Sequence, residues 1–162
     1  MARPVRMSLG WSVALGAVGA LAVLAVLPPV LGGEPGALVR GAFSTVCHQL
    51  PDRTPHLHGA PIALCHRCSG ILAGLLAGVT LAPLAGSDML GRIARSGQIG
   101  WLVLAGVPTA LDWGLGALGL WTNTPASRML TGVLFGIVAG GVLAANLLTS
   151  RPSRTLSPSP AS

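Results

Sequence analysis

The chain has 162 residues, of which 51% are hydrophobic and only 9% are charged. Soluble domains carry about 25% charged residues, so this chain has too little polar surface to cover a soluble globule. The composition indicates an integral membrane protein whose main partner is the lipid bilayer. The net charge of +6 comes from arginines scattered between apolar segments without interleaved aromatic residues, so we do not expect nucleic-acid binding.

A short basic head, residues 1–8, precedes a first apolar run at residues 9–31 that carries no charge. About 20 apolar residues in helical form cross a hydrocarbon core of about 30 Å. The apolar region of a cleaved signal peptide is shorter, about 7–15 residues, and ends in a small-residue cleavage site. This run ends at Pro28-Pro29, so we expect a retained membrane-spanning helix.

A polar connection at residues 33–63 follows the first run. Its first half can form a short surface helix at residues 37–50. Prolines and a glycine then break regular structure at Pro51, Pro55, Gly59 and Pro61. A connection of this length without clear elements is usually functional or disordered, and its cysteine and histidine content favours a function.

Three further apolar segments, at residues 64–84, 99–120 and 128–149, complete a predicted set of four spans. We expect a short loop at residues 86–98 and a turn at residues 121–127. Residues 151–162 are rich in Arg, Ser and Pro and are typical of a disordered tail. The sequence therefore predicts an all-α, polytopic integral membrane protein with a single four-helix transmembrane domain at residues 9–149.

The arginines carry a modest orientation signal. With four spans, six arginines lie on the side of the two termini and four on the other side. Cytoplasmic loops are enriched in Lys and Arg, so the count predicts a multi-pass protein of the cell (inner) membrane with both termini in the cytoplasm. The connection then becomes a Cys/His-containing outer loop. The four outer arginines lie near the polar motifs and can serve a site instead, which weakens the count.

Glycine repeats at every fourth residue in the second and fourth spans: Gly70, Gly74 and Gly78, then Gly132, Gly136 and Gly140. Small residues at this spacing let helix backbones approach closely in lipid, where no hydrophobic force joins helices. With four spans the two helices run in the same direction, so we expect a close parallel pair. His66 and Arg128 each stand four residues before a stripe, so this contact would bring them together.

Residues 47–68 hold all three cysteines and all four histidines. Three cysteines cannot all pair within one chain, so their number favours a metal site or a reactive dithiol over a disulfide framework. Cys65 and Cys68 fall on the first turn of the second span. The helix N-terminus and the adjacent Arg67 favour the thiolate form, which binds metals and attacks disulfides.

Cys47, together with His48 or His66, completes a Cys₃His set with the two later cysteines, of the kind that binds zinc tetrahedrally. The sequence does not choose between these histidines, and copper or iron also remains open. His56 and His58 lie in the proline-rich loop, where we expect them to be solvated. Alternatively, the cysteines exchange electrons with a quinone or a partner thiol, or the chain is a structural membrane subunit without chemistry.

Asp112 lies inside the third span, four residues after Pro108. An ionisable residue inside a membrane is expected to be functional or paired, and a proline-broken helix beside it suits a cavity. Arg128 and Arg67 are the expected partners, and Asn123 adds a polar group on the same side. A structural ion pair between helices is the plainer alternative. No Ser-His-Asp arrangement, phosphate loop or carboxylate pair is present, so no catalytic residue is assigned and an enzymatic role stays open.

The Cys-His-Gln motif at residues 47–49 occurs with the C-x-R-C motif at residues 65–68. They are accompanied by Ser69-Gly70, Gly74, Asp112, Thr122-Asn123, Arg128 and Thr131-Gly132. In this combination, over about residues 40–145, the sequence resembles a family of predicted bacterial and archaeal membrane proteins, domain of unknown function 2085. It departs from that family at Arg53-Thr54, where members usually carry Arg-Ser. The resemblance implies a multi-span membrane protein and brings no established activity; a homo-oligomer or a membrane partner protein stays open.

Overall fold

A computed structural model describes residues 7–95 and 97–149. The predicted tail at 151–162 and residues 1–6 of the predicted basic head lie outside this part. The elements in chain order are α1 (Leu9–Val26), α2 (Pro28–Leu31), α3 (Gly33–Phe43), the 3₁₀ helix η1 (Pro51–Arg53), β1 (His56–Leu57), β2 (Ala60–Pro61), α4 (His66–Leu81), the 3₁₀ helix η2 (Ala82–Ala85), α5 (Gly86–Arg95), α6 (Gln98–Ala117) and α7 (Pro125–Thr149).

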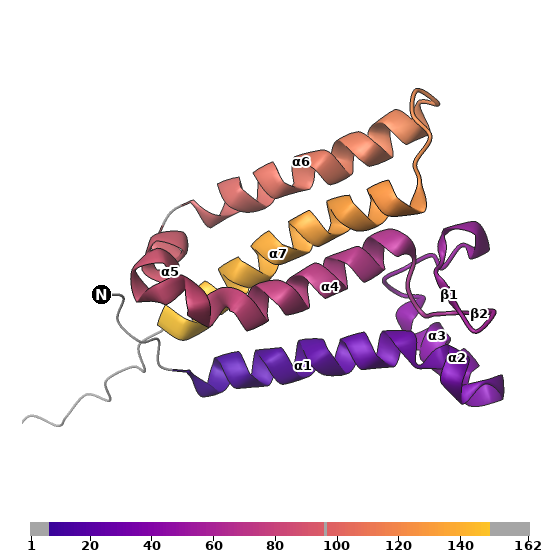
Figure 1. The fold of residues 1–162 in the computed structure, drawn as a ribbon, viewed down its shortest axis with the longest axis horizontal. Coiled ribbons are helices and arrows are strands. Elements are labelled where there is room, and N and C mark those ends of the chain that lie inside the picture. The colour runs from indigo at the N-terminus through magenta and orange to yellow at the C-terminus, as the bar shows by residue number, and fades with distance from the viewer. Residues whose placement is uncertain (1–6, 96, 150–162) are drawn as a thin grey trace, which may run out of the picture.

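Four of the described segments are long and apolar enough to cross a membrane: α1, α4 with η2, α6 and α7. Their mean hydropathy lies between 1.2 and 2.1. They lie side by side in the spatial order α1, α4, α7, α6, with α1 and α6 at opposite edges (Figure 1). This confirms the prediction of an all-α polytopic membrane protein with four spans. We call the two ends of this bundle the cysteine end, where Cys47, Cys65 and Cys68 lie, and the α5 end.

The sequence predicts one continuous helix over the first apolar run to residue 31, but the structure divides this run into two helices. Helix α1 ends at Val26, and the short helix α2 begins at Pro28. Proline has no backbone N–H and cannot continue the hydrogen-bond ladder, but it is well suited to the first position of a new helix. The surface helix expected at residues 37–50 also lies earlier, as α3. The first span is therefore shorter than predicted, and the chain turns at its end.

The last two spans also differ from their predicted bounds. Helix α6 ends at Ala117 because Gly119 adopts a φ of 71°, and the Leu120 N–H donates to the Leu115 carbonyl over 3.0 Å. This is a glycine-terminated helix end. Helix α7 starts at Pro125, before residue 128, because the Thr124 hydroxyl accepts the Ser127 N–H over 3.0 Å.

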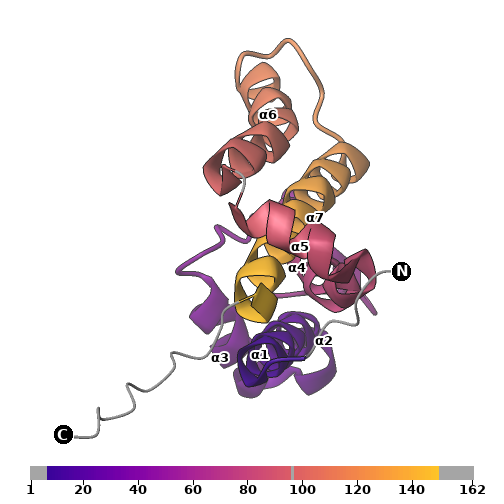
Figure 2. The ribbon, with the colours of Figure 1, turned by 90° about the vertical axis from the view of Figure 1, so that its left-hand side faces the viewer.

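The prediction of a loop at residues 86–98 is wrong, because most of this segment forms helix α5. Leu90 is fully buried and Ile93 and Ala94 pack beside it, which gives α5 one apolar face. Arg92 lies exposed on the remaining surface. Figure 2 shows α5 lying across the ends of α4 and α7.

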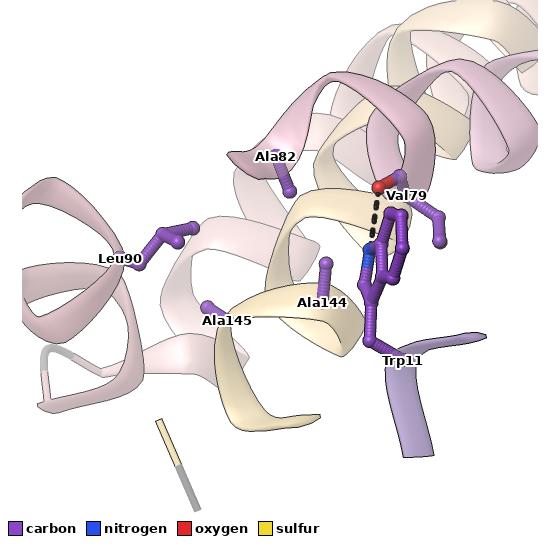
Figure 3. Close-up of a cluster of buried hydrophobic side chains, with 6 residues drawn as sticks. All are labelled: Trp11, Val79, Ala82, Leu90, Ala144 and Ala145. Carbon is purple, nitrogen blue, oxygen red and sulfur yellow. Dashed lines mark hydrogen bonds between the residues drawn. The ribbon is translucent and has the colours of Figure 1, made fainter. Parts of the chain in front are cut away.

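A cluster of buried side chains closes the α5 end of the bundle. It joins α1, α4, η2, α5 and α7 through Trp11, Val79, Ala82, Leu90, Ala144 and Ala145 (Figure 3). The indole N–H of Trp11 donates to the Val79 carbonyl over 3.0 Å. A buried indole N–H needs such a partner, so this hydrogen bond fixes how α1 lies on α4.

The two glycine stripes lie against each other between α4 and α7. A Cβ atom built on Gly74 would lie 3.0 Å from the Cα atom of Gly136, and one on Gly78 would lie 3.0 Å from that of Gly140. The contacting residue numbers rise together along both helices, so the pair is parallel, as expected. The helix backbones touch where a side chain would hold them apart.

The predicted irregular connection is folded at the cysteine end. Strands β1 and β2 form a hairpin in which His58 and Gly59 both have positive φ, 51° and 79°, as a tight two-residue hairpin turn requires. The Arg40 guanidinium donates to the Pro61 and Ile62 carbonyls over 3.1 and 2.9 Å. The Ala63 N–H donates to the Ala25 carbonyl over 2.8 Å, which ties the connection to α1. The segments that carry the cysteines are thereby held in place.

Candidate metal-binding site

Three cysteines from two parts of the chain converge at the cysteine end. Cys47 follows α3 and is buried, Cys65 is the N-cap of α4, and Cys68 lies on the first turn of that helix. Their sulfur atoms all lie within 4.8 Å of one another, and all three residues are free thiols. The backbone N–H of Cys65 donates to the Cys47 sulfur over 3.3 Å. The predicted convergence of the three cysteines is therefore present in the fold.

The spacing of the sulfur atoms fits a tetrahedral metal ion. A zinc–sulfur bond of about 2.3 Å places two sulfur ligands about 3.8 Å apart in a tetrahedron. The three sulfurs, within 4.8 Å of one another, need to move by only about 1 Å to reach that geometry. Since two of them occupy one helical turn and the third a loop end, such a movement requires no change of fold.

The electrostatics favour a thiolate at the start of α4. A hydrogen bond from the Cys68 side chain lowers the pKa of Cys65 to about 5, against the opposing effect of burial. Cys65 also stands at the N-terminus of a helix, where the backbone N–H groups stabilise negative charge. These contacts favour the deprotonated form of the Cys65 sulfur, which is the form that binds metal ions.

The histidines do not join the three sulfurs. The Nδ1 atom of His66 lies 2.7 Å from the Arg53 carbonyl, so its ring is held by the loop. His48 is exposed and borders the cavity beside the thiols. His56 and His58 are exposed on the hairpin, in keeping with the expectation of solvated rings. Of the predicted Cys₃His set, the structure brings together the three cysteines only.

A cavity of about 370 Å³ opens beside the thiols. Its wall carries sulfur, imidazole, guanidinium and indole groups, from Cys47, Cys65, Cys68, His48, Arg53, Arg67, Arg128 and Trp113. His66 does not line this cavity, so the predicted meeting of His66 and Arg128 does not form its wall. Arg67, one residue further along α4, lines the cavity together with Arg128, while His66 turns to the loop.

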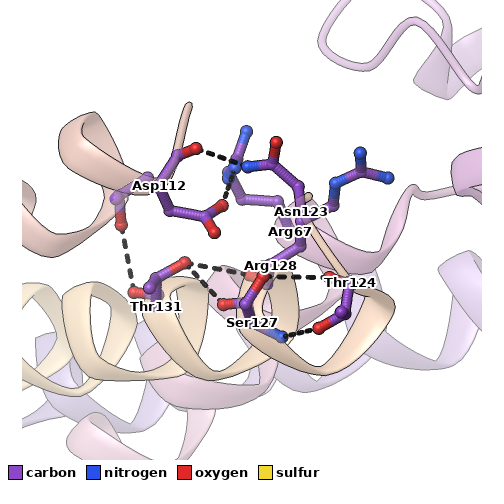
Figure 4. Close-up of polar contacts among 8 residues, drawn as sticks. Arg67, Asp112, Asn123, Thr124, Ser127, Arg128 and Thr131 are labelled. Atoms are coloured by element: carbon purple, nitrogen blue, oxygen red, sulfur yellow. Dashed lines mark hydrogen bonds and ion pairs between the residues drawn. The ribbon is translucent and has the colours of Figure 1, made fainter. Parts of the chain in front are cut away.

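Asp112 is buried in α6 and forms an ion pair with Arg67 (Figure 4). Arg67 lies on the first turn of α4, between Cys65 and Cys68 in the sequence. Of the two predicted partners of Asp112, the structure thus selects Arg67. The Asn123 side-chain amide donates to the backbone carbonyl of Asp112, which fastens the loop after α6 to this pair. Three of the predicted supporting residues, Arg67, Asp112 and Asn123, are therefore linked to one another, and Arg67 connects them to the helical turn that carries Cys65 and Cys68.

Arg40 is one of the four outer arginines that can serve a site, but the sequence assigns it no particular contact. In the structure Arg40 connects α3 to β2 and the residue after it, and its carbonyl accepts from the Gln49 side chain over 2.6 Å. Gln49 itself adopts a φ of 49°. The Cys-His-Gln motif is the sequence feature that points to this contact, because its third residue, Gln49, supports the turn next to Cys47.

The fold and this site define the class of the protein: a polytopic helical membrane protein with a thiol-lined cavity at one end. A comparison with protein families matches residues 47–142 to the family described as "Predicted membrane protein (DUF2085)". The match covers more than half of the chain, which therefore belongs to this family. The matched stretch begins at the first of the three cysteines.

A relative from Methanocaldococcus jannaschii, described as an uncharacterized protein, is 31% identical over 94 residues. The aligned part covers 58% of this chain and 58% of the relative, so the chain spans little more than half of that relative's length. No solved structure matches the chain.

Proposed function

We propose that this membrane protein binds a zinc-type metal ion through Cys47, Cys65 and Cys68. The observation that carries the proposal is the approach of three free thiols, from the end of α3 and the start of α4, to within 4.8 Å. Soft thiolate ligands select zinc, copper(I) or iron over hard cations. Zinc is the first candidate because it binds thiolates tetrahedrally without needing a redox partner. Copper and iron are the other candidates.

A fourth ligand position of this site would face the cavity, because all three cysteines line it. His48 borders the cavity and is the candidate protein ligand there, whereas the His66 ring is held by the Arg53 carbonyl. Structural zinc sites have four protein ligands, and catalytic ones keep a position open for water or substrate. The role of His48 therefore decides between a structural and an open metal site.

We further propose that the site lies at the outer face of a cell (inner) membrane, with both ends of the four-helix domain in the cytoplasm. The positive-inside rule supports this orientation, because Arg92 and Arg95 lie on α5 at the opposite end of the bundle. Single-cysteine labelling from outside intact cells, with a reagent that does not cross membranes, tests it: a cysteine at exposed Thr45 should react and one at Arg92 should not.

Metal analysis of detergent-purified protein tests the metal site. Protein prepared without chelator should hold one metal ion per chain, and Cys65→Ser or Cys68→Ser should each remove it. His56→Gln, on the exposed hairpin, is the matched control and should keep the metal. His48→Gln should weaken retention only if His48 is the fourth ligand.

Two results would count against the metal site. Protein without stoichiometric metal that carries three reactive thiols would exclude it. A Cys65–Cys68 disulfide that is reduced and reoxidised by a quinol–quinone couple would instead support the thiol-disulfide oxidoreductase considered from the sequence.

A further inference from the structure

The cavity beside the thiols contains arginine donors that the protein does not satisfy. Arg128 is half-buried and lines this cavity, yet no carboxylate among the described residues lies within ion-pair distance of it. Arg67 uses its Nη2 atom for Asp112, but its Nε–H is buried and has no acceptor in the described part of the chain. Because the Arg67 Nε atom has almost no exposed surface, Arg128 supplies the unpaired donors at the cavity wall.

The carboxylates around the cavity leave one arginine without an ion-pair partner among the described residues. Asp112 neutralises Arg67, and Asp52 pairs with Arg53 over 3.4 Å at the exposed rim. No such carboxylate serves Arg128. A guanidinium stays charged at every physiological pH, and its planar fork matches the two oxygens of a carboxylate or phosphate. A half-buried arginine without a partner is therefore suited to an anionic ligand.

We infer that this cavity binds an oxyanion, a carboxylate or phosphate group, held by Arg128, with the positively charged Arg67 guanidinium lining the same cavity. The volume of about 370 Å³ lies within the range of small-molecule pockets, about 300–1,000 Å³. The ligand shares the cavity with the proposed metal site, so it lies beside the three sulfurs. The inference extends the proposed function, but the two arginines do not need the metal in order to bind the anion.

The oxyanion has two physical sources, a dissolved anion or the headgroup of an anionic lipid. A second, mainly apolar hollow shares Arg67 and Trp113 with the cavity and continues along Ile71, Ala110 and Phe135 between the helices. A hydrocarbon chain attached to a bound headgroup would run along this apolar hollow. The experiment must therefore test both a dissolved anion and an anionic lipid.

Ligand binding to the full chain in detergent tests this inference, with zinc-loaded and chelator-treated protein measured in parallel by native mass spectrometry. One arm titrates inorganic phosphate and acetate; the other titrates phosphatidylglycerol, with phosphatidylcholine as the uncharged comparison. We expect saturable one-to-one binding in one arm, at least tenfold weaker in Arg128→Gln and partly restored in Arg128→Lys. Arg92→Gln, at the α5 end, is the matched control and should bind as the unaltered protein does.

The outcomes separate this inference from the metal proposal. Arg128→Gln should keep its metal content and its melting temperature, which shows that a loss of binding is not a loss of fold. Binding of phosphate or acetate identifies a dissolved ligand, and binding of phosphatidylglycerol alone identifies a lipid. Binding that is absent in both arms, or that is unchanged by Arg128→Gln, overturns the inference even if the metal is present. Arg128-dependent binding to a chain without metal sustains it while the metal proposal fails.

Discussion

Arg67 does two things at once, because it stands between the two cysteines of α4 and pairs with the buried Asp112 of α6. Neither charge is well solvated, since the Asp112 side chain is 6% exposed and that of Arg67 is 20% exposed. Each charge therefore depends on the other to offset its desolvation. The Asn123 amide, which donates to the Asp112 backbone carbonyl, adds a neutral tie to the same pair.

Replacing one member of this pair should lower the free energy of unfolding by more than replacing both members. Asp112→Ala leaves a partly buried guanidinium without its carboxylate, and breaking a buried pair in this way typically costs about 3–5 kcal/mol. The double variant Asp112→Ala/Arg67→Met removes the orphaned charge and should recover part of that loss. Unfolding in detergent, followed by circular dichroism, measures both values. Strictly additive losses would show that the two residues are not coupled.

Among the elements, α4 and α7 form the closest pair, and the glycine stripes explain why. At Gly74 and Gly136 the neighbouring atoms belong to the other helix's backbone, which cannot move aside as a flexible side chain can. By contrast, only 6% of the apolar window of α6 is buried, and α6 is attached through α7 and the Arg67–Asp112 pair. The bundle therefore has a tight centre and a lightly attached edge helix.

A methyl group on the central pair should separate the two helices. Gly74→Ala and Gly136→Ala should each lower the free energy of unfolding by about 1–3 kcal/mol, the usual cost of overpacking. Gly141→Ala is the matched control on α7, because nothing lies within 4 Å of a Cβ atom built there. It should be neutral or stabilising by up to about 1 kcal/mol, since alanine favours helix. Denaturant titration that ranks Gly141→Ala as the most damaging would contradict this contact.

Some features of the fold and site can be predicted from the sequence, whereas others depend on contacts between distant segments. The four apolar runs, the glycine stripes and the two α4 cysteines depend on spacing along one helix, which the sequence records directly. The sequence predicts a loop where helix α5 lies, because glycines and charged residues obscure its one apolar face. That face can be recognised only once it packs against α7. The choice of Arg67 over Arg128 as partner of Asp112, and the turn of His66 to the loop, depend on tertiary geometry.

At the scale of the whole molecule, the bundle is closed differently at its two ends. Apolar packing around Trp11 and Leu90 closes the α5 end. At the cysteine end, hydrogen bonds from Arg40 and a smaller cluster around Ala25, Cys47 and Leu64 hold the connection. A metal ion on the three thiols would join this connection to α4, so its binding energy would stabilise the folded connection.

Removing the metal should therefore lower the melting temperature of the whole protein. A ligand present at about 1,000 times its dissociation constant stabilises the folded state by about 4 kcal/mol, and a chelator removes that contribution. Acid should act in the same direction, because protons compete with the metal for the thiolates. Thermal unfolding with and without chelator measures the effect, and Cys68→Ser should show none. An unchanged melting temperature on removal of bound metal would mean that the ion does not stabilise the connection.

The order of the site residues along the chain has a consequence for biosynthesis. All three sulfurs belong to the first 68 residues, whereas Asp112, Trp113 and Arg128 follow in the last two spans. Proteins are made from the N-terminus, so the thiols emerge from the ribosome before the rest of the cavity wall exists. Arg67 then lacks its carboxylate until α6 is inserted, and α4 lacks its closest neighbour until α7 is complete. If a metal ion binds the three thiols, as proposed, it would be able to load before membrane assembly is complete, and the helices synthesised last would then close the cavity around it.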